Sequence, residues 1–164
     1  MRKLRARLLV LLAAASLIAV DQYFKYLAGK YLAPQETRAF LPGLRLRHTL
    51  NTGVSFSLLG DSPLAMRIVT ILTIAVMAAG IVLLLIGRIK PVPALCAAAL
   101  IIAGGTGNLV DRLLRGCVID YLEFTFVRFA VFNFADVCIT CGVILLSAWM
   151  IWDERQKKKS RQAP

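Results

Sequence analysis

The sequence predicts an all-α integral membrane protein in which four transmembrane helices form a bundle. Of its 164 residues, 59% are hydrophobic, whereas soluble domains reach about 45–50%. Four apolar segments, 8–27, 64–86, 92–114 and 129–151, match the about 20 helical residues that cross a hydrocarbon core of roughly 30 Å. Since no internal repeat or low-complexity linker separates them, we expect one membrane domain over residues 1–164.

The first segment, 8–27, has the basic start and the alanine-rich middle of a cleaved signal peptide. Its helical pattern continues through Asp21 and Lys25, which share a helix face because they are spaced i, i+4, so an ion pair is expected. Such a continuation would be unusual at the start of a mature soluble protein. We therefore expect the segment to be retained as the first span.

The long loop before the second span contains local signals of structure. LRLRHTLN, residues 44–51, begins with alternating apolar and polar side chains, which predicts a short strand. Asp61 or Ser62 as a helix cap, followed by Pro63 in the first turn, marks the start of the second span. Arg67, close to that start, is expected to be an interfacial anchor.

The third span ends in a polar stretch, and a second strand is expected after it. Gly104, Asn108 and Asp111 share one helix face by their i, i+4, i+7 spacing, and the glycines of this stretch allow a neighbouring helix to approach closely. CVIDYLEFTFVRF, residues 117–129, is rich in β-branched and aromatic residues, which predicts a strand on the membrane surface. The fourth span then carries Asp136 about two turns from its start.

The basic residues set the expected orientation. The net charge is +11, and eleven Lys and Arg fall in the tails 1–7 and 153–164 and in the turn between the second and third spans. By the positive-inside rule both termini are cytoplasmic, and the loops 28–63 and 115–128 face outward. Because no basic face with interleaved aromatic residues is present, we expect membrane lipids, and no nucleic acid, as partners.

With this orientation, the polar side chains of all four spans lie in the outer part of the membrane, and the cytoplasmic halves are almost wholly apolar. A charged side chain at the centre of a span costs roughly 2.5–3.5 kcal/mol, so its presence needs a reason. The layer comprises Asp21, Lys25, Arg67, Asn108, Asp111, Arg112, Asn133 and Asp136.

Two acids lack a cation nearby in the sequence. Asp111 is followed by Arg112, so ion pairing explains it. Asp120 and Asp136 have no such neighbour, and the short connection between them allows both to reach one point at the outer surface. Two carboxylates held together in a low-dielectric site share a proton. One can then take a proton from water while the other protonates a scissile carbonyl, as in aspartic proteases.

Other chemistries find little support. The single histidine, His48, lies in an outer loop, and no spacing typical of metal ligands is present, so no metal or cofactor is expected. Cysteines occur four times in apolar surroundings, and we expect them to be small buried packing residues. They are Cys96, Cys117, Cys138 and Cys141.

Five short motifs follow one another in the order DQYFK, NTGVSF, GGTGNLVDR, VIDY and FNFAD. In this order they resemble the motifs of the bacterial lipoprotein signal peptidases, signal peptidase II. The resemblance implies an inner-membrane aspartic endopeptidase that removes the signal peptide of prolipoproteins just before a diacylglyceryl-modified cysteine. It also implies four transmembrane helices with a small extracytoplasmic β-cradle and a surface helix, an active site at the outer face, and no cofactor. We expect a monomer.

By matching position, the resemblance implies that Asp120 and Asp136 are the catalytic pair. The residues implied to line or orient the substrate site are Asn51, Gly53, Asn108, Arg112 and Asn133. Those implied to support the structure of the site are Asp21, Lys25 and Asp111.

Two alternatives stay open. A non-enzymatic, ion-coupled membrane carrier would also bury acids, but its path should continue polar to the cytoplasmic side. A different intramembrane aspartyl protease, such as one acting on prepilin-like substrates, would be expected to have other motifs around each aspartate.

Overall fold

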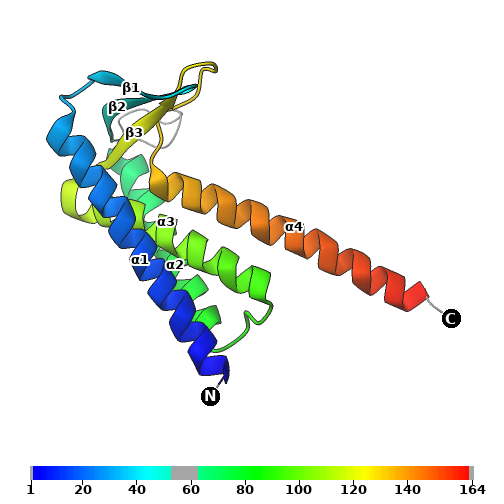
Figure 1. Cartoon of the computed structure of the whole chain (residues 1–164). Helices are drawn as coiled ribbons and strands as arrows, with labels where there is room; N and C mark the ends of the chain where they lie inside the picture. Colours follow the sequence, from blue (N-terminus) through cyan, green and yellow to red (C-terminus); the bar gives the residue numbers. More distant parts are fainter. Residues whose placement is uncertain (1, 53–62, 163–164) are drawn as a thin grey trace.

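The computed structural model describes residues 2–52 and 63–162, which form four helices and three strands. In chain order these are α1 (Arg2–Tyr31), β1 (Thr37–Leu41), β2 (Leu44–Asn51), α2 (Pro63–Leu85), α3 (Val92–Arg115), β3 (Val118–Phe124) and α4 (Phe134–Gln162). Figure 1 shows the strands together at one end of the helices, where α1 ends and α4 begins. The N-terminus lies at the other end of α1, and α4 extends away from the other helices toward the C-terminus.

Three helices are long and apolar enough to cross a membrane, and they correspond to the second, third and fourth predicted spans. They are Leu64–Leu85, Val92–Arg115 and Phe134–Arg161. α1 is one continuous helix of 30 residues but is not among them, so its crossing stays a prediction.

α3 is the central helix of the bundle. Half of the apolar 18-residue stretch of α3 is buried inside the protein, compared with 11% of the corresponding stretch of α2 and 17% of that of α4. A β-carbon at Gly104 would lie 2.2 Å from the carbonyl oxygen of Ala135 in α4, and one at Gly105 would lie 2.4 Å from the Sδ atom of Met77 in α2. Gly107 faces α1 in the same way. The prediction that these glycines allow close helix approach is confirmed.

The strands form an antiparallel sheet in the order β1-β2-β3. β2 has the bounds expected from its alternation, and β3 falls within the second predicted strand segment. β1 was not predicted, because all five of its residues are exposed and no apolar face marks it. Its turn into β2 is made by Pro42 and Gly43, whose φ of +83° suits the glycine.

The expected start of the fourth span at Phe129 is wrong, because α4 begins at Phe134. Phe132 instead pairs with Leu122 of β3, and each donates its backbone N–H to the other's carbonyl at 2.8 Å. Asp136 is therefore in the first turn of the helix, not two turns inside it.

The helix also continues beyond the predicted end of the span. Ion pairs spaced i, i+4 connect Asp153 with Lys157 and Glu154 with Lys158 along its last turns. All helical residues between 2 and 52 and between 63 and 162 belong to the four long helices, so the implied surface helix is not in that part of the chain. Asp61 and Ser62, the predicted caps of α2, lie outside the described residues.

Candidate active site

Asp120 and Asp136 line the same cavity, which has a volume of about 470 Å³. Asp120 projects from β3 and is 3% exposed, whereas Asp136 belongs to the first turn of α4. The cavity is lined by Asn51, Asn108, Arg112, Val118, Asp120, Phe124, Phe129, Ala130, Val131, Phe132, Asp136, Val137, Ile139, Thr140 and Cys141. Its polar wall thus carries both carboxylates, and the remainder is mainly apolar.

All four oxygen atoms of these two carboxylates accept hydrogen bonds from amide groups. Asp120 Oδ2 accepts from Asn51 Nδ2 at 2.9 Å, and its Oδ1 accepts from Asn133 Nδ2 at 2.7 Å. Asp136 Oδ1 accepts from Asn108 Nδ2 at 2.8 Å, and its Oδ2 accepts from the backbone N–H of Asn133 at 3.0 Å. Three asparagines therefore hold both carboxylates in fixed orientations.

Asn133 and Asp136 form a reciprocal cap at the start of α4. The backbone N–H of Asp136 donates to Asn133 Oδ1 at 3.0 Å, in return for the bond from the Asn133 backbone. This cap explains why the helix starts at Phe134. Asn133 is fully buried behind the carboxylates and is not part of the cavity lining, so its position suits an orienting role.

The orientation of the Asn108 amide is set by Lys25. The ammonium of Lys25 donates to Asn108 Oδ1 at 2.9 Å. Because an ammonium has no acceptor, the amide oxygen of Asn108 must face it, and the NH₂ group then faces Asp136. The same oxygen also accepts from Asn133 Nδ2 at 3.1 Å. A buried charge from α1 thereby orients a donor toward the cavity.

Behind this amide layer lies a buried ion cluster. Lys25 Nζ is 2.9 Å from Asp21 Oδ2 and 2.8 Å from Asp111 Oδ2, and the three residues are at most 1% exposed. The predicted Asp21–Lys25 pair is confirmed. The predicted pairing of Asp111 with Arg112 is wrong, because Asp111 pairs with Lys25 and with Arg115. Adjacent residues face different sides of a helix, whereas i, i+4 residues share one.

Arg112 instead faces the cavity. Its guanidinium interacts electrostatically with Asp136 and Asp120, and its Nη1 donates to the backbone oxygen of Asn108 at 3.3 Å. The Nε of Arg112 is buried and has no hydrogen-bond partner within residues 2–52 and 63–162. A half-buried cation with a spare, buried donor is thus part of the same wall as the two carboxylates.

Burial raises the pKa of Asp120 to about 7. The hydrogen bonds from Asn51 and Asn133 oppose this effect, and the nearby charge of Asp136 adds to it. Asp120 therefore holds a proton on a substantial fraction of molecules near neutral pH, as a proton-sharing carboxylate pair requires.

Gln22 is a member of the ion cluster that the sequence analysis missed. Its Nε2 lies 3.2 Å from Asp21 Oδ2, 3.1 Å from Asp111 Oδ1 and 3.1 Å from the carbonyl oxygen of Gly107. The signal was present, because Gln22 is a polar side chain at the same depth of the first span as Asp21 and Lys25.

The remaining residues named in the sequence analysis are Gly53, Arg67 and His48. Gly53 is outside the described residues, and Arg67 is exposed at a second cavity beside Arg112. His48 is buried in β2 and is not among the residues that line the active-site cavity, and within the described ranges neither of its ring nitrogens has a partner.

All four cysteines are free. Cys117 and Cys138 are buried as predicted, but Cys96 and Cys141 are exposed, which corrects that expectation. Cys141 lines the candidate active-site cavity. No cluster of three or more His, Cys, Asp or Glu that could hold a metal ion occurs in the part of the chain that the structure describes.

Comparison with known proteins gives concordant results. A protein-family model described as signal peptidase (SPase) II matches residues 13–152. The lipoprotein signal peptidase of Enterococcus faecalis is 35% identical over 158 residues, which cover 94% of this chain and 96% of that protein. That of Francisella tularensis subsp. mediasiatica is 36% identical over 165 residues, covering 98% of this chain and all of that protein.

Solved structures agree on the fold. A bacterial membrane enzyme solved in meso at 2.3 Å resolution superposes with a TM-score of 0.82 and 26% identity, covering 90% of each chain. A second one, at 1.9 Å resolution, gives a TM-score of 0.78 and 26% identity, covering 86% of this chain and 91% of the other.

Proposed function

This chain belongs to the lipoprotein signal peptidase family, and we propose that Asp120 and Asp136 are the catalytic pair with which it cleaves before a diacylglyceryl-modified cysteine. It is a signal peptidase II, an aspartic peptidase of several membrane spans that removes signal peptides from prolipoproteins. The proposed pair is supported chiefly by one observation, the two carboxylates on one cavity wall with every oxygen held by an amide donor.

The raised pKa of Asp120 supports this residue as the protonated member of the pair near neutral pH. Asp136 lies in the first turn of α4 and accepts the backbone N–H of Asn133. Asp136 would then take a proton from the attacking water while Asp120 protonates the scissile carbonyl oxygen. The spare Nε donor of Arg112, on the same wall, suits a substrate carbonyl.

The apolar part of the cavity suits a lipid-bearing substrate. Val137, Thr140 and Cys141 follow Asp136 along α4, and all three are exposed. They extend the wall from the carboxylates toward the apolar surface of the helix. We therefore assign this strip to the substrate's lipid or signal segment, which stays in the bilayer while the scissile bond meets the carboxylates.

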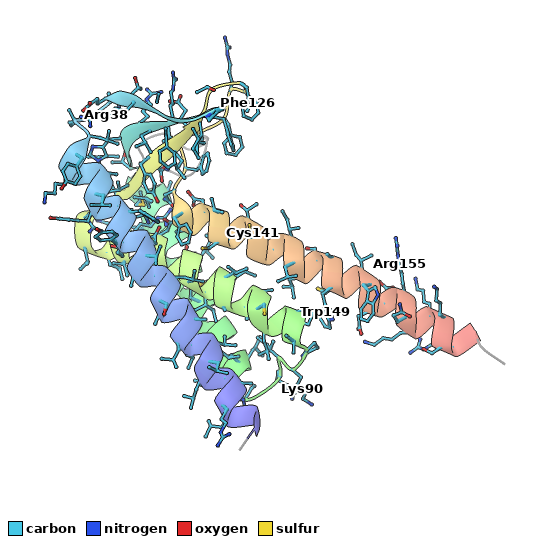
Figure 2. All side chains as sticks on the ribbon, in the orientation of Figure 1. Arg38, Lys90, Phe126, Cys141, Trp149 and Arg155 are labelled. Carbon is cyan, nitrogen blue, oxygen red and sulfur yellow. The ribbon has the colours of Figure 1, made fainter. Side chains whose placement is uncertain are left out.

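We further propose that the chain crosses the membrane four times, with both termini in the cytoplasm. With 30 residues, α1 is about 45 Å long, enough to cross the bilayer. Its Val10 and Ala14 pack with Ala99 and Ile102 of α3 in one core cluster. In Figure 2, Lys90 lies near the N-terminal end of the molecule and Arg38 lies at the sheet end. The positive-inside rule then predicts that the sheet and the active site lie at the outer face of the inner membrane.

The test is cleavage of a diacylglyceryl-modified precursor by purified protein. Asp120→Asn and Asp136→Asn should each lower the rate by about 10²–10⁴-fold or more, because each removes one proton-transfer group. Asp153→Asn, near the other end of α4, is the matched control and should cleave normally. Wild-type rates in either site variant would refute the assignment. Equal cleavage of an unlipidated precursor would refute the requirement for the lipid.

A further inference from the structure

The two acids of the ion cluster are each tied to the residue that precedes a catalytic aspartate. Asp21 Oδ1 accepts the backbone N–H of Ala135 at 2.9 Å, directly before the aspartate of α4. Asp111 Oδ2 accepts the backbone N–H of Ile119 at 3.3 Å, directly before the aspartate of β3. A change in the distance between Asp21 and Asp111 would therefore move the two chain segments that carry the catalytic carboxylates.

Gln22 joins these two acids. Its NH₂ group is within 3.2 Å of acceptors on Asp21, Asp111 and Gly107. Its oxygen accepts from Arg115 Nη1 at 3.1 Å. The neighbours of the nitrogen are all acceptors and a guanidinium has only donors, so the amide has a single orientation that satisfies the cluster.

We propose that Gln22 is a positioning residue for the reaction, which cross-links Asp21 and Asp111 and thereby fixes the separation of the catalytic pair. The inference rests on the proposed function, because it takes Asp120 and Asp136 as that pair. Gln22 has no hydrogen bond to either of them, so it acts through α1 and α3 rather than on the substrate.

Lys25 alone does not hold the cluster in one geometry. It contacts Asp111 through Oδ2 only, and the other oxygen, Oδ1, is bonded by Gln22 and Arg115. Without the amide of Gln22, Oδ1 of Asp111 has no hydrogen bond to α1, because its other partner, Arg115, belongs to α3. Since a misplacement of about 1 Å can cost roughly 10²-fold in rate, loss of this cross-link should reduce turnover.

The first test is Gln22→Met, which keeps the length of the side chain and removes its hydrogen bonds. We expect kcat for the lipidated precursor to fall about 10²-fold, with KM within about twofold of wild type because no substrate contact is lost. Gln156→Met, on the exposed far part of α4, is the matched control and should leave both constants unchanged. An unchanged kcat, or a rise in KM alone, would overturn the inference.

The second test is Gln22→Glu, which introduces a carboxyl group among Asp21, Asp111, Lys25 and Arg115. β3 and α4 contribute backbone N–H groups to this cluster. When protonated, the new group can still donate a hydrogen bond, but when ionised it cannot and it repels the two acids. Activity relative to wild type should therefore fall as pH rises, and a constant ratio across pH would contradict the proposal.

These experiments separate the inference from the function on which it rests. Normal cleavage by Gln22→Met together with inactive Asp120→Asn would reject the positioning role and keep the catalytic pair. Full activity of Asp120→Asn would reject the pair itself. If Gln22→Met gives no folded protein, the pH dependence of Gln22→Glu decides.

Discussion

Replacement of Lys25 by methionine tests the ion cluster most directly. The ammonium is fully buried and contacts Asp21, Asp111 and Asn108 at 2.8–2.9 Å. Methionine fills a similar volume but supplies none of these bonds. Two buried carboxylates would then lose their shared cation, and only Asp111 would keep another, Arg115.

The expected loss of stability is large. Removing one partner of a buried ion pair typically costs about 3–5 kcal/mol, because the remaining charge is left without compensation. For a chain of this size that loss corresponds to a drop in Tm of roughly 10 °C. Turnover should fall as well, because the Asn108 amide is no longer oriented and its donor to Asp136 is lost.

Thermal unfolding of the purified protein in one detergent measures the effect. The control is Lys30→Met, because Lys30 is exposed and lies over the rings of Tyr26 and Tyr31. We expect a loss of at most about 1 kcal/mol for that variant. Adding Asp21→Asn to Lys25→Met should recover part of the stability, since it removes the unpaired charge. Equal Tm values for Lys25→Met and Lys30→Met would refute the reasoning.

Two further predictions concern the carboxylate pair and the helix packing. The folded protein holds the Asp120 proton up to about pH 7, whereas the unfolded chain releases it near about pH 4, so this group's stabilising contribution is lost as pH rises between those values. Thermal unfolding should therefore show Asp120→Asn gaining stability relative to wild type from acid to pH 8, and a difference that is constant with pH would contradict the raised pKa. Gly104→Ala places a methyl group 2.2 Å from the Ala135 carbonyl oxygen, so we expect a loss of about 1–3 kcal/mol and reduced cleavage. Gly29→Ala, which has no neighbour within 4 Å, should be neutral or slightly stabilising, and equal behaviour of the two variants would show that helix approach at Gly104 is not limiting.

The length of the apolar runs predicted α2 and α3 closely, because an uninterrupted hydrophobic segment between polar turns has few other solutions. The same criterion gave the wrong start for α4. Residues 129–132 are as apolar as a membrane-spanning helix, yet Phe132 pairs with β3. Hydrophobicity does not separate strand from helix over so few residues. Asn133 followed by Asp136 was the available signal for the true start, as a capping pair.

The site could be predicted at the level of residues, but not of all partners. Depth in the membrane and the lack of a neighbouring cation identified Asp136 and Asp120 as candidates, and the structure brings both to one cavity. The partner of Asp111 was misassigned because adjacency in sequence was taken for adjacency in space. The relation of Asp111 to Lys25 depends on how α1 packs on α3, which no local pattern encodes.

The difference in partners also separates the roles of the four acids. Asp21 and Asp111 contact cations directly, and charge-assisted bonds of this kind hold an ionised carboxylate most strongly. Asp120 and Asp136 contact amide donors, which orient a carboxylate without supplying a full charge. Only a pair of the second kind can pass a proton between water and substrate while its geometry stays fixed. Lys25 contacts Asp21, Asp111 and Asn108, so it connects the ion-paired acids to the amide that donates to Asp136.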